Sequence, residues 1–133
     1  MKEPEKTFQL WIKNLLDNSI VSVDSTVSAH EVARLLENSD SGAVIVLENQ
    51  IPVGIVTNRD LTLKIIAHSY PFDTPIRRIM STPLISITPD TEMSVAKDIL
   101  TSKKIRKLPI ISNDEIIGIV VASDVSKVIP NSA

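Results

Sequence analysis

The pattern of apolar and polar positions in the first half of the chain predicts a strand, a helix and a strand pair. Apolar residues alternate over 21–23, as they do in a half-buried strand. The next apolar residues recur with the spacing of one helical face, and they are Ala29, Val32, Ala33 and Leu36. Two apolar runs, 43–47 and 53–57, then flank the polar turn 48–50, which indicates a β-hairpin.

The second half repeats this order of elements. Runs at 85–87, 107–111 and 116–121 predict three strands, the last two joined by a polar turn. Pro89 and Asp90 are expected to open the helix that follows the first of these strands. The apolar stripe of this helix comprises Met93, Ala96, Ile99 and Leu100.

Local signals support a helix start and the two turns. Ser28 followed by Glu31 forms a capping-box pattern in front of the first helix. Asn49 and Asn113 occupy the two turns, where asparagine tolerates a positive φ angle. Each half is expected to continue into a second helix directly after its last strand.

The two halves are copies of one motif. At an offset of 64 residues they align without a gap, so that Gly54-Ile55-Val56 falls on Gly118-Ile119-Val120 and Asp60 falls on Asp124. Chance supplies single matches in a chain so rich in Ile and Val, but not readily this triplet and this acid at constant spacing. The sequence therefore predicts an α/β fold of the α+β type, built from two β-α-β-β-α repeats.

The repeats are expected to form a single domain over 1–133. A unit of about 55 residues is marginal alone, because it buries too little of its surface. We therefore predict that the two sheets pack together in pseudo-two-fold symmetry and share one core. The expected boundaries are 15–68 for the first repeat, 69–79 for the linker and 80–129 for the second repeat.

A third apolar pattern precedes the repeats. Residues with helical spacing predict an N-terminal helix, and they are Phe8, Trp11, Ile12, Leu15 and Leu16. We expect this helix to pack on the body of the protein or on a second subunit. Docking explains Phe8 and Trp11 better than ligand binding does.

Composition and charge narrow the function classes. The formal net charge is −2, which argues against a surface for DNA or RNA phosphates. Aromatic residues make up only 3% of the chain, so no platform for base stacking is expected, and nucleic-acid binding is disfavoured. The basic residues that would carry it are Arg77, Arg78, Lys103, Lys104, Arg106 and Lys107. The absence of cysteine excludes disulfides, thiolate metal sites and a cysteine nucleophile.

Other classes are disfavoured as well. No apolar run approaches the ~18 residues that a membrane-spanning helix needs, and a cytoplasmic location is expected. His30 and His68 stand alone, and no nucleophile, base and oxyanion donor converge, so an enzyme is not expected.

Three stretches in their order and duplication resemble the CBS (cystathionine β-synthase) domain family. They are Gly-Ile-Val-Thr-Asn-Arg-Asp at 54–60, Ile-Met-Ser-Thr-Pro at 79–83 and Ile-Arg-Lys-Leu-Pro-Ile at 105–110. The resemblance covers about 15–129 and is to a stand-alone tandem pair, a Bateman module. It implies stacked sheets, two clefts that take AMP, ADP, ATP or an S-adenosyl ligand, and frequent dimerisation.

The first expected site lies around the end of 53–57. An aspartate at position 60 can accept two hydrogen bonds from a ribose diol, and Thr57 and Asn58 stand at a helix N-terminus that suits a phosphate. Arg59 adds positive charge there. By the family pattern, the adenine slot of this site is formed by Pro83, Leu84 and Ile85.

The second expected site is less complete. Val121 stands where the first repeat has Thr57, and Ser123 is one candidate substitute for the missing hydroxyl. Basic residues just before a strand are expected to reach a phosphate, and residues of the first repeat to line the base. The members of this site are Ile20, Val21, Ala43, Arg106, Lys107, Ile119, Ser123 and Asp124.

Several interpretations remain open from the sequence. Thr57 and Asp60 also fit a purely structural capping box. The favoured function is a regulatory sensor of an adenine nucleotide (AMP, ADP or ATP), with no cofactor required, acting as a homodimer or on an unidentified effector protein. The alternatives are S-adenosylmethionine binding and a structural dimerisation or interaction module without a ligand.

Overall fold

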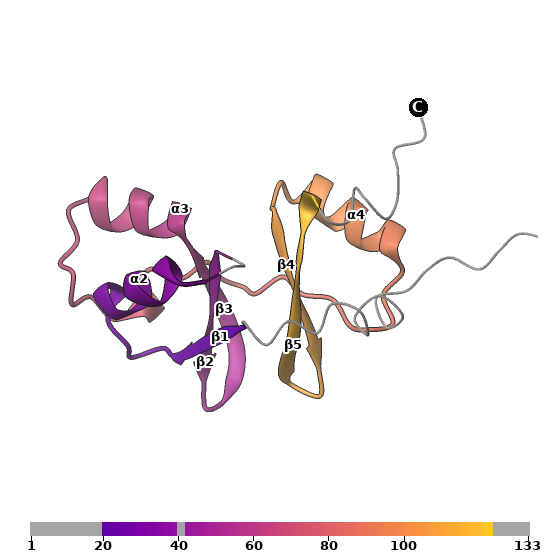
Figure 1. The fold of residues 1–133 in the computed structure, drawn as a ribbon, viewed down its shortest axis with the longest axis horizontal. Coiled ribbons are helices and arrows are strands. Elements are labelled where there is room, and N and C mark those ends of the chain that lie inside the picture. Colours follow the sequence, from indigo (N-terminus) through magenta and orange to yellow (C-terminus); the bar gives the residue numbers. More distant parts are fainter. Residues whose placement is uncertain (1–19, 40–41, 124–133) are drawn as a thin grey trace, which may run out of the picture. The chain divides into compact units, whose positions relative to one another are not determined.

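The computed structural model describes residues 20–39 and 42–123. The predicted N-terminal helix and Asp124 lie outside the described residues. The chain divides into two compact units (Figure 1), whose described parts are 20–39 and 42–84, the first unit, and 85–123, the second unit. Each unit is mixed α+β with its own small sheet, as predicted.

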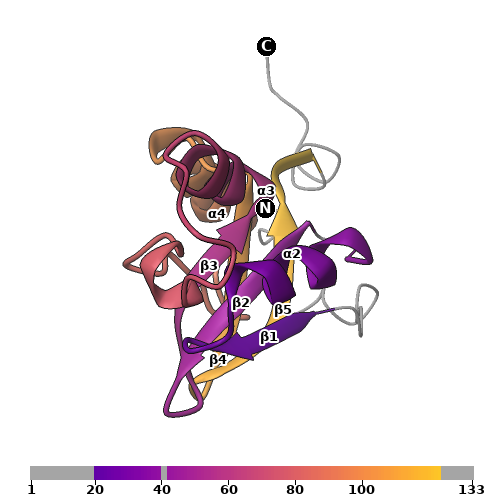
Figure 2. The same cartoon turned by 90° about the vertical axis from the view of Figure 1, so that its left-hand side faces the viewer.

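The first unit is built on a three-stranded sheet in the order β1-β2-β3. Strand β1 (Val21–Asp24) runs parallel to β2 (Ala43–Glu48), and helix α2 (Ala29–Glu37) connects them, as a parallel pair requires. Strand β3 (Ile51–Thr57) pairs antiparallel with β2 as a hairpin. Figure 2 shows α2 lying over one face of this sheet.

The predicted helix signals hold in the first unit. The Ser28 hydroxyl accepts a hydrogen bond from the Glu31 backbone N–H at 3.2 Å, which confirms Ser28 as the N-cap of α2. The predicted stripe packs on the sheet: Ala29, Val32 and Leu36 are buried in one apolar cluster with Val44 of β2 and Val56 of β3. Only Ala33 of the stripe is exposed.

A helical segment follows β3 directly. It begins as α3 (Asn58–Asp60) and continues without a break as the π-helix η1 (Leu61–Ile66), whose Ile65 joins the same core. The segment expected to be a linker then packs into this unit, with the short 3₁₀ helix η2 (Ile76–Arg78) inside it.

Backbone hydrogen bonds explain why this segment belongs to the first unit. The N–H of Ile76 donates to the carbonyl of Val27 at 2.7 Å, and Ala29 at the start of α2 donates to Thr74 at 2.8 Å. Ile76 and Ile79 have no exposed surface and lie in the core. The division between the units therefore follows Leu84, where no pattern of apolar residues marks it.

The second unit repeats this plan in a shorter form. It contains α4 (Met93–Ser102) and the antiparallel pair β4 (Lys107–Ser112) and β5 (Glu115–Val121). The strand expected at 85–87 is reduced to one parallel bridge, in which Ile87 donates to the Pro109 carbonyl and accepts from Ile111.

The start of the second helix differs from the expectation. Helix α4 begins at Met93 with Glu92 as N-cap, not at Pro89 and Asp90. Residues 89–90 form a turn, in which the Thr88 N–H donates to the Thr91 hydroxyl at 3.1 Å and so engages a donor before the helix begins.

Pairing in the two hairpins confirms the repeat at the level of single residues. Ala43 pairs with Thr57 and Lys107 pairs with Val121, at the same offset of 64 positions. Both hairpins carry a register shift at equivalent places, after Val46 and after Ile110. Both turns place their two residues at positive φ, including Asn49 and Asn113 as predicted.

The two equivalent glycines give a matched test of the first unit's packing. A Cβ on Gly54 would lie 2.6 Å from Met80 Sδ and 3.1 Å from the Ser81 carbonyl oxygen, whereas one on Gly118 would meet only Ile110 Cδ1 at 3.5 Å. We expect Gly54→Ala to destabilise the protein by about 1–3 kcal/mol through overpacking. Gly118→Ala is expected to be neutral or to stabilise by up to about 1 kcal/mol, because glycine is costly within a strand.

Thermal unfolding of both variants beside the wild type measures this difference. Equal midpoints for Gly54→Ala and Gly118→Ala would show that the contact between β3 and Met80 is not tight.

Candidate functional site

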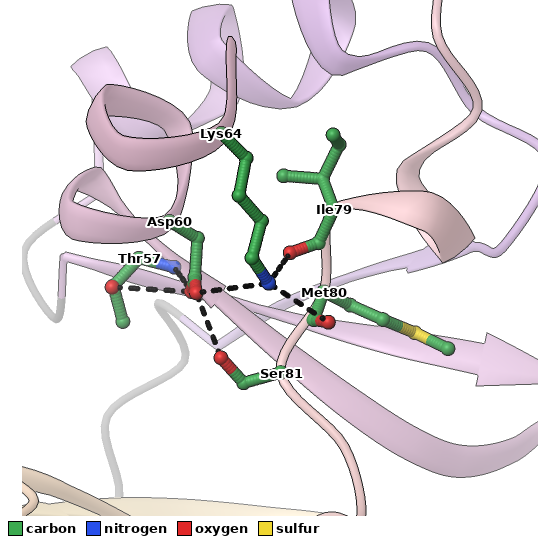
Figure 3. Close-up of polar contacts among 6 residues, drawn as sticks. All are labelled: Thr57, Asp60, Lys64, Ile79, Met80 and Ser81. Carbon is green, nitrogen blue, oxygen red and sulfur yellow. Dashed lines mark hydrogen bonds and ion pairs between the residues drawn. The ribbon is translucent and has the colours of Figure 1, made fainter. Parts of the chain in front are cut away.

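The site centres on the carboxylate of Asp60, at the junction of β3 and α3. Thr57 ends the strand in an extended conformation, and the chain turns into the helix at Asn58. Oδ2 of Asp60 accepts a hydrogen bond from the Thr57 backbone N–H at 2.9 Å and from its hydroxyl at 3.3 Å (Figure 3). Asp60 therefore contributes to the helix cap, as one of the sequence interpretations holds.

The other oxygen of Asp60 contacts residues from outside the strand–helix junction. Oδ1 accepts a hydrogen bond from the Ser81 hydroxyl at 2.7 Å and lies 3.8 Å from Lys64 Nζ. Only 13% of the Asp60 side chain is exposed. A carboxylate offers about four acceptor positions, so these four contacts engage most of its capacity.

Lys64 joins the helix to the chain that leaves the first unit. It lies four residues after Asp60, and its Nζ donates to the carbonyl of Ile79 at 2.6 Å and to that of Met80 at 3.5 Å. Figure 3 shows its ammonium between the Asp60 carboxylate and these two carbonyls. The helical segment 58–66 thus holds residues 79–81 through the Lys64 ammonium and the Asp60 carboxylate.

Neither Lys64 nor Ser81 was predicted as a site residue, although Ser81 lies in the stretch 79–83 that carries the family resemblance. The spacing of Asp60 and Lys64 is that of neighbours on a helix surface, which is the signal that could have found Lys64. Ser81 is 21 residues away from Asp60 and has no such signal.

Of the predicted members of the first site, Thr57 and Asp60 are in direct contact. Asn58 lines a pocket of about 380 Å³ between α2 and η1, which neither Thr57 nor Asp60 lines. Arg59 is exposed on α3. In the predicted base slot, Pro83 is exposed and Leu84 half-buried at the end of the first unit, and Ile85 begins the second unit.

Comparison with known proteins assigns the family. The model of the CBS domain matches the chain twice, over residues 12–67 and 76–131. The chain belongs to the CBS domain family. Its two copies of the motif make it a tandem CBS regulatory module, which agrees with the resemblance seen in the sequence.

Relatives of known sequence cover most of the chain. The CBS domain-containing protein YhcV of Bacillus subtilis is 29% identical over 115 residues, which are 86% of this chain and 82% of that protein. An uncharacterized protein of Methanopyrus kandleri is 37% identical over 114 residues, 84% of this chain but only 58% of its own length.

Solved structures show the same fold. A CBS-domain containing protein of Agrobacterium tumefaciens superposes with a TM-score of 0.81 at 23% identity, covering 92% of this chain and 98% of that one. A CBS domain protein of Pyrobaculum aerophilum, complexed with AMP, has a TM-score of 0.76 at 24% identity and covers 90% and 89%. The cytosolic domain of the Mg²⁺ channel MgtE, in complex with ATP, has a TM-score of 0.70 at 20% identity and covers 84% and 45%.

The predicted second site draws on both CBS motifs. Ile20, Val21 and Ala43 belong to the first unit, with Val21 at the start of β1 and Ala43 at the start of β2. The remaining described members belong to the second unit, and they are Arg106, Lys107, Ile119 and Ser123.

Within the second unit, one hydrogen bond relates two parts of this predicted site. The N–H of Ala122, next to Ser123, donates to the carbonyl of Arg106 at 2.8 Å. This bond places the exposed Arg106 beside the start of the helical turn at 122–123. The second site as a whole stays a prediction, since its acid, Asp124, lies outside the described residues.

The described residues show neither a cluster of metal ligands nor a membrane-spanning helix. No group of three or more His, Asp or Glu side chains among them is placed to hold a metal ion. Within the same residues, every helix is too short or too polar to cross a membrane.

Removal of the Lys64 ammonium tests how far the contacts around Asp60 stabilise the first CBS motif. We expect Lys64→Met to lower stability by about 1–2 kcal/mol, because the carbonyls of Ile79 and Met80 lose a charged donor. This expected loss of stability is smaller than the loss for a fully buried charged hydrogen bond, because 36% of the Lys64 side chain is exposed.

Lys103→Met is the matched control, because Lys103 is exposed on the turn after α4. Thermal unfolding should separate the two variants by several degrees. Identical midpoints would mean that Lys64 contributes no more than a solvated surface charge.

Proposed function

We propose that this tandem CBS module is a sensor that binds an adenine nucleotide, AMP, ADP or ATP, at the Asp60 carboxylate of its first motif. The observation that carries the proposal is an acid held at the strand–helix junction of the Gly-Ile-Val-Thr-x-x-Asp stretch at 54–60. The AMP complex of the Pyrobaculum aerophilum protein and the ATP complex of the MgtE domain support an adenine nucleotide as the ligand.

The chemistry of the acid suits a ribose. A carboxylate accepts hydrogen bonds from both hydroxyls of a 2′,3′-diol, and such bonds to a charged acceptor contribute about 1.5–3 kcal/mol each. The exposed guanidinium of Arg59, one residue before the acid, supplies positive charge for a phosphate. This charge favours a nucleotide over S-adenosylmethionine, whose sulfonium is a cation.

The expected affinity is modest. Burial of ~150 Å² of apolar base surface contributes ~4 kcal/mol, the ribose bonds add a few more, and association costs ~4 kcal/mol or more. The balance is roughly −3 to −6 kcal/mol, which corresponds to a dissociation constant between the millimolar and the tens-of-micromolar range. Such a value suits a regulatory module that responds to changes in nucleotide concentration.

Calorimetric titration with AMP, ADP, ATP and S-adenosylmethionine tests the proposal. We expect at least one nucleotide to bind the wild type and Asp60→Asn to weaken it roughly 10–100-fold, since the neutral amide replaces a charged acceptor. Asp73→Asn, at an exposed acid of the same unit, is the control and should bind as the wild type does. Absence of heat and of thermal stabilisation with all four compounds at millimolar concentration would refute it.

A second candidate function, dimerisation, has its own observation. Ile66 is 68% exposed and Phe72 is 66% exposed, and both line the pocket between α2 and η1. Exposed large apolar side chains that gather at one place are typical of an interaction surface. A second copy of the chain that covers this surface would make the module a homodimer, with or without a ligand.

Sedimentation of surface variants tests this candidate. We expect the wild type to sediment as a dimer and Ile66→Lys as a monomer, because a buried unpaired ammonium is costly. Ile51→Lys is the control, since Ile51 is 46% exposed at the hairpin end of β3. A monomeric wild type, or a dimer that Ile66→Lys leaves intact, would rule out this surface.

A further inference from the structure

We propose that the Ser81 hydroxyl is a latch that competes with the ribose for Oδ1 of Asp60, so that nucleotide binding releases the chain leading from the first unit to the second unit. This inference rests on the proposed nucleotide site. Its basis is the 2.7 Å hydrogen bond from Ser81 Oγ to Asp60 Oδ1.

The acceptor capacity of Asp60 makes competition necessary. Its two oxygens already accept from Thr57 and Ser81 and face the Lys64 ammonium, and 13% of the side chain is exposed. A ribose diol brings two further donors to a group with about four acceptor positions. At least one present donor has to leave when the diol binds.

Among the groups at Oδ1, the oxygen outside the helix cap, Ser81 is the donor that can leave at least cost. The Thr57 N–H is a fixed backbone group, and moving it would open the helix cap. Lys64 is held in place by the carbonyls of Ile79 and Met80. Ser81 is exposed, so its hydroxyl can rotate about one bond and donate to water.

Ser81 also attaches the chain to strand β3 through its backbone. Its backbone pairs with Ile55 of β3, donating to the Ile55 carbonyl at 2.8 Å and accepting from the Ile55 N–H at 3.3 Å. Among the hydrogen bonds of the described first unit, those of Ser81 are the last before the chain passes through 82–84 to the second unit at Ile85. Ser81 therefore fixes the point at which the covalent connection leaves the first unit.

When the Ser81 hydroxyl no longer bonds to Asp60, Ser81 is attached to the first unit only by its backbone pair with Ile55. The cross-strand pair with Ile55 is isolated and not part of a longer ladder. The side-chain bond to Asp60 is the second attachment of the same residue, so its release is expected to increase opening of the bridge. Occupancy of the nucleotide site is thereby coupled to the freedom of the connection.

Calorimetry on Ser81 variants tests the competition, with AMP as the probe and ATP as the second nucleotide. Because Ser81→Ala removes the competitor, we expect it to bind about 2–10-fold more tightly than the wild type, the factor that matches the net contribution of one hydrogen bond. Ser81→Thr keeps a hydroxyl and should bind with wild-type affinity. Ser102→Ala, at an exposed serine of α4, is the matched control and should also be unchanged.

Amide hydrogen exchange gives the structural readout on the full chain. Saturating AMP should speed exchange of the Ser81 amide in the wild type, whereas in Ser81→Ala exchange should already be fast without AMP and change little. AMP that binds with unchanged or weaker affinity to Ser81→Ala, or that slows exchange at Ser81, would overturn the latch while the proposed function stands. Failure of both nucleotides to bind the wild type would overturn the proposed function and the latch with it.

Discussion

The local structure of the first unit depends on the contacts of the Asp60 carboxylate. This carboxylate contacts three segments: the end of β3 at Thr57 and the π-helix at Lys64, both within four residues of it, and the departing chain at Ser81, 21 residues away. A carboxylate that is mostly withdrawn from water requires such partners, because an unpaired buried charge is expensive. The same requirement fixes the β3–α3 junction and draws 79–81 against it.

The repeat explains why the motif has this shape, and the two copies diverge in sequence at positions that make these contacts in the first copy. Pairing registers, bulges and turns recur at an offset of 64 residues, so both copies share a backbone plan. The side chains differ where the first copy holds the departing chain. Val121 stands in the place of Thr57, and the sequence places Val128 where the first copy has Lys64. Gly54 is pressed by Met80 and the Ser81 carbonyl, whereas Gly118 meets only Ile110.

The sequence predicted what local chemistry decides. Alternating apolar residues located the hairpins, Ser28 located a cap, and asparagines located turns at positive φ. It was less successful where partners are distant. The strand expected at 85–87 keeps only the bridge of Ile87, and the expected linker is drawn into the first unit by Ile76 and Ile79. In the sequence, Ile76 follows Pro75 and resembles part of a connection, and only the structure shows the core in which it is buried.

In the candidate site, too, the sequence predicted the local contact and missed the distant ones. Thr57 and Asp60 were predicted as a pair because they lie within one helical turn, and the contact between them is local. Ser81 and Ile79 approach this pair only through tertiary structure, so no spacing in the sequence indicates them.

The capping and ligand-binding interpretations of Asp60 do not exclude one another. The two oxygens of the carboxylate have different partners: Oδ2 faces the backbone of Thr57, and Oδ1 faces the exposed hydroxyl of Ser81. The cap fixes the side chain in one orientation, so a ligand would meet an acid whose conformational freedom is already lost. On our proposal the structural role of Oδ2 is what prepares Oδ1 for a ribose. A carboxylate with both oxygens in the cap could not act this way, and one without a cap would bind more weakly.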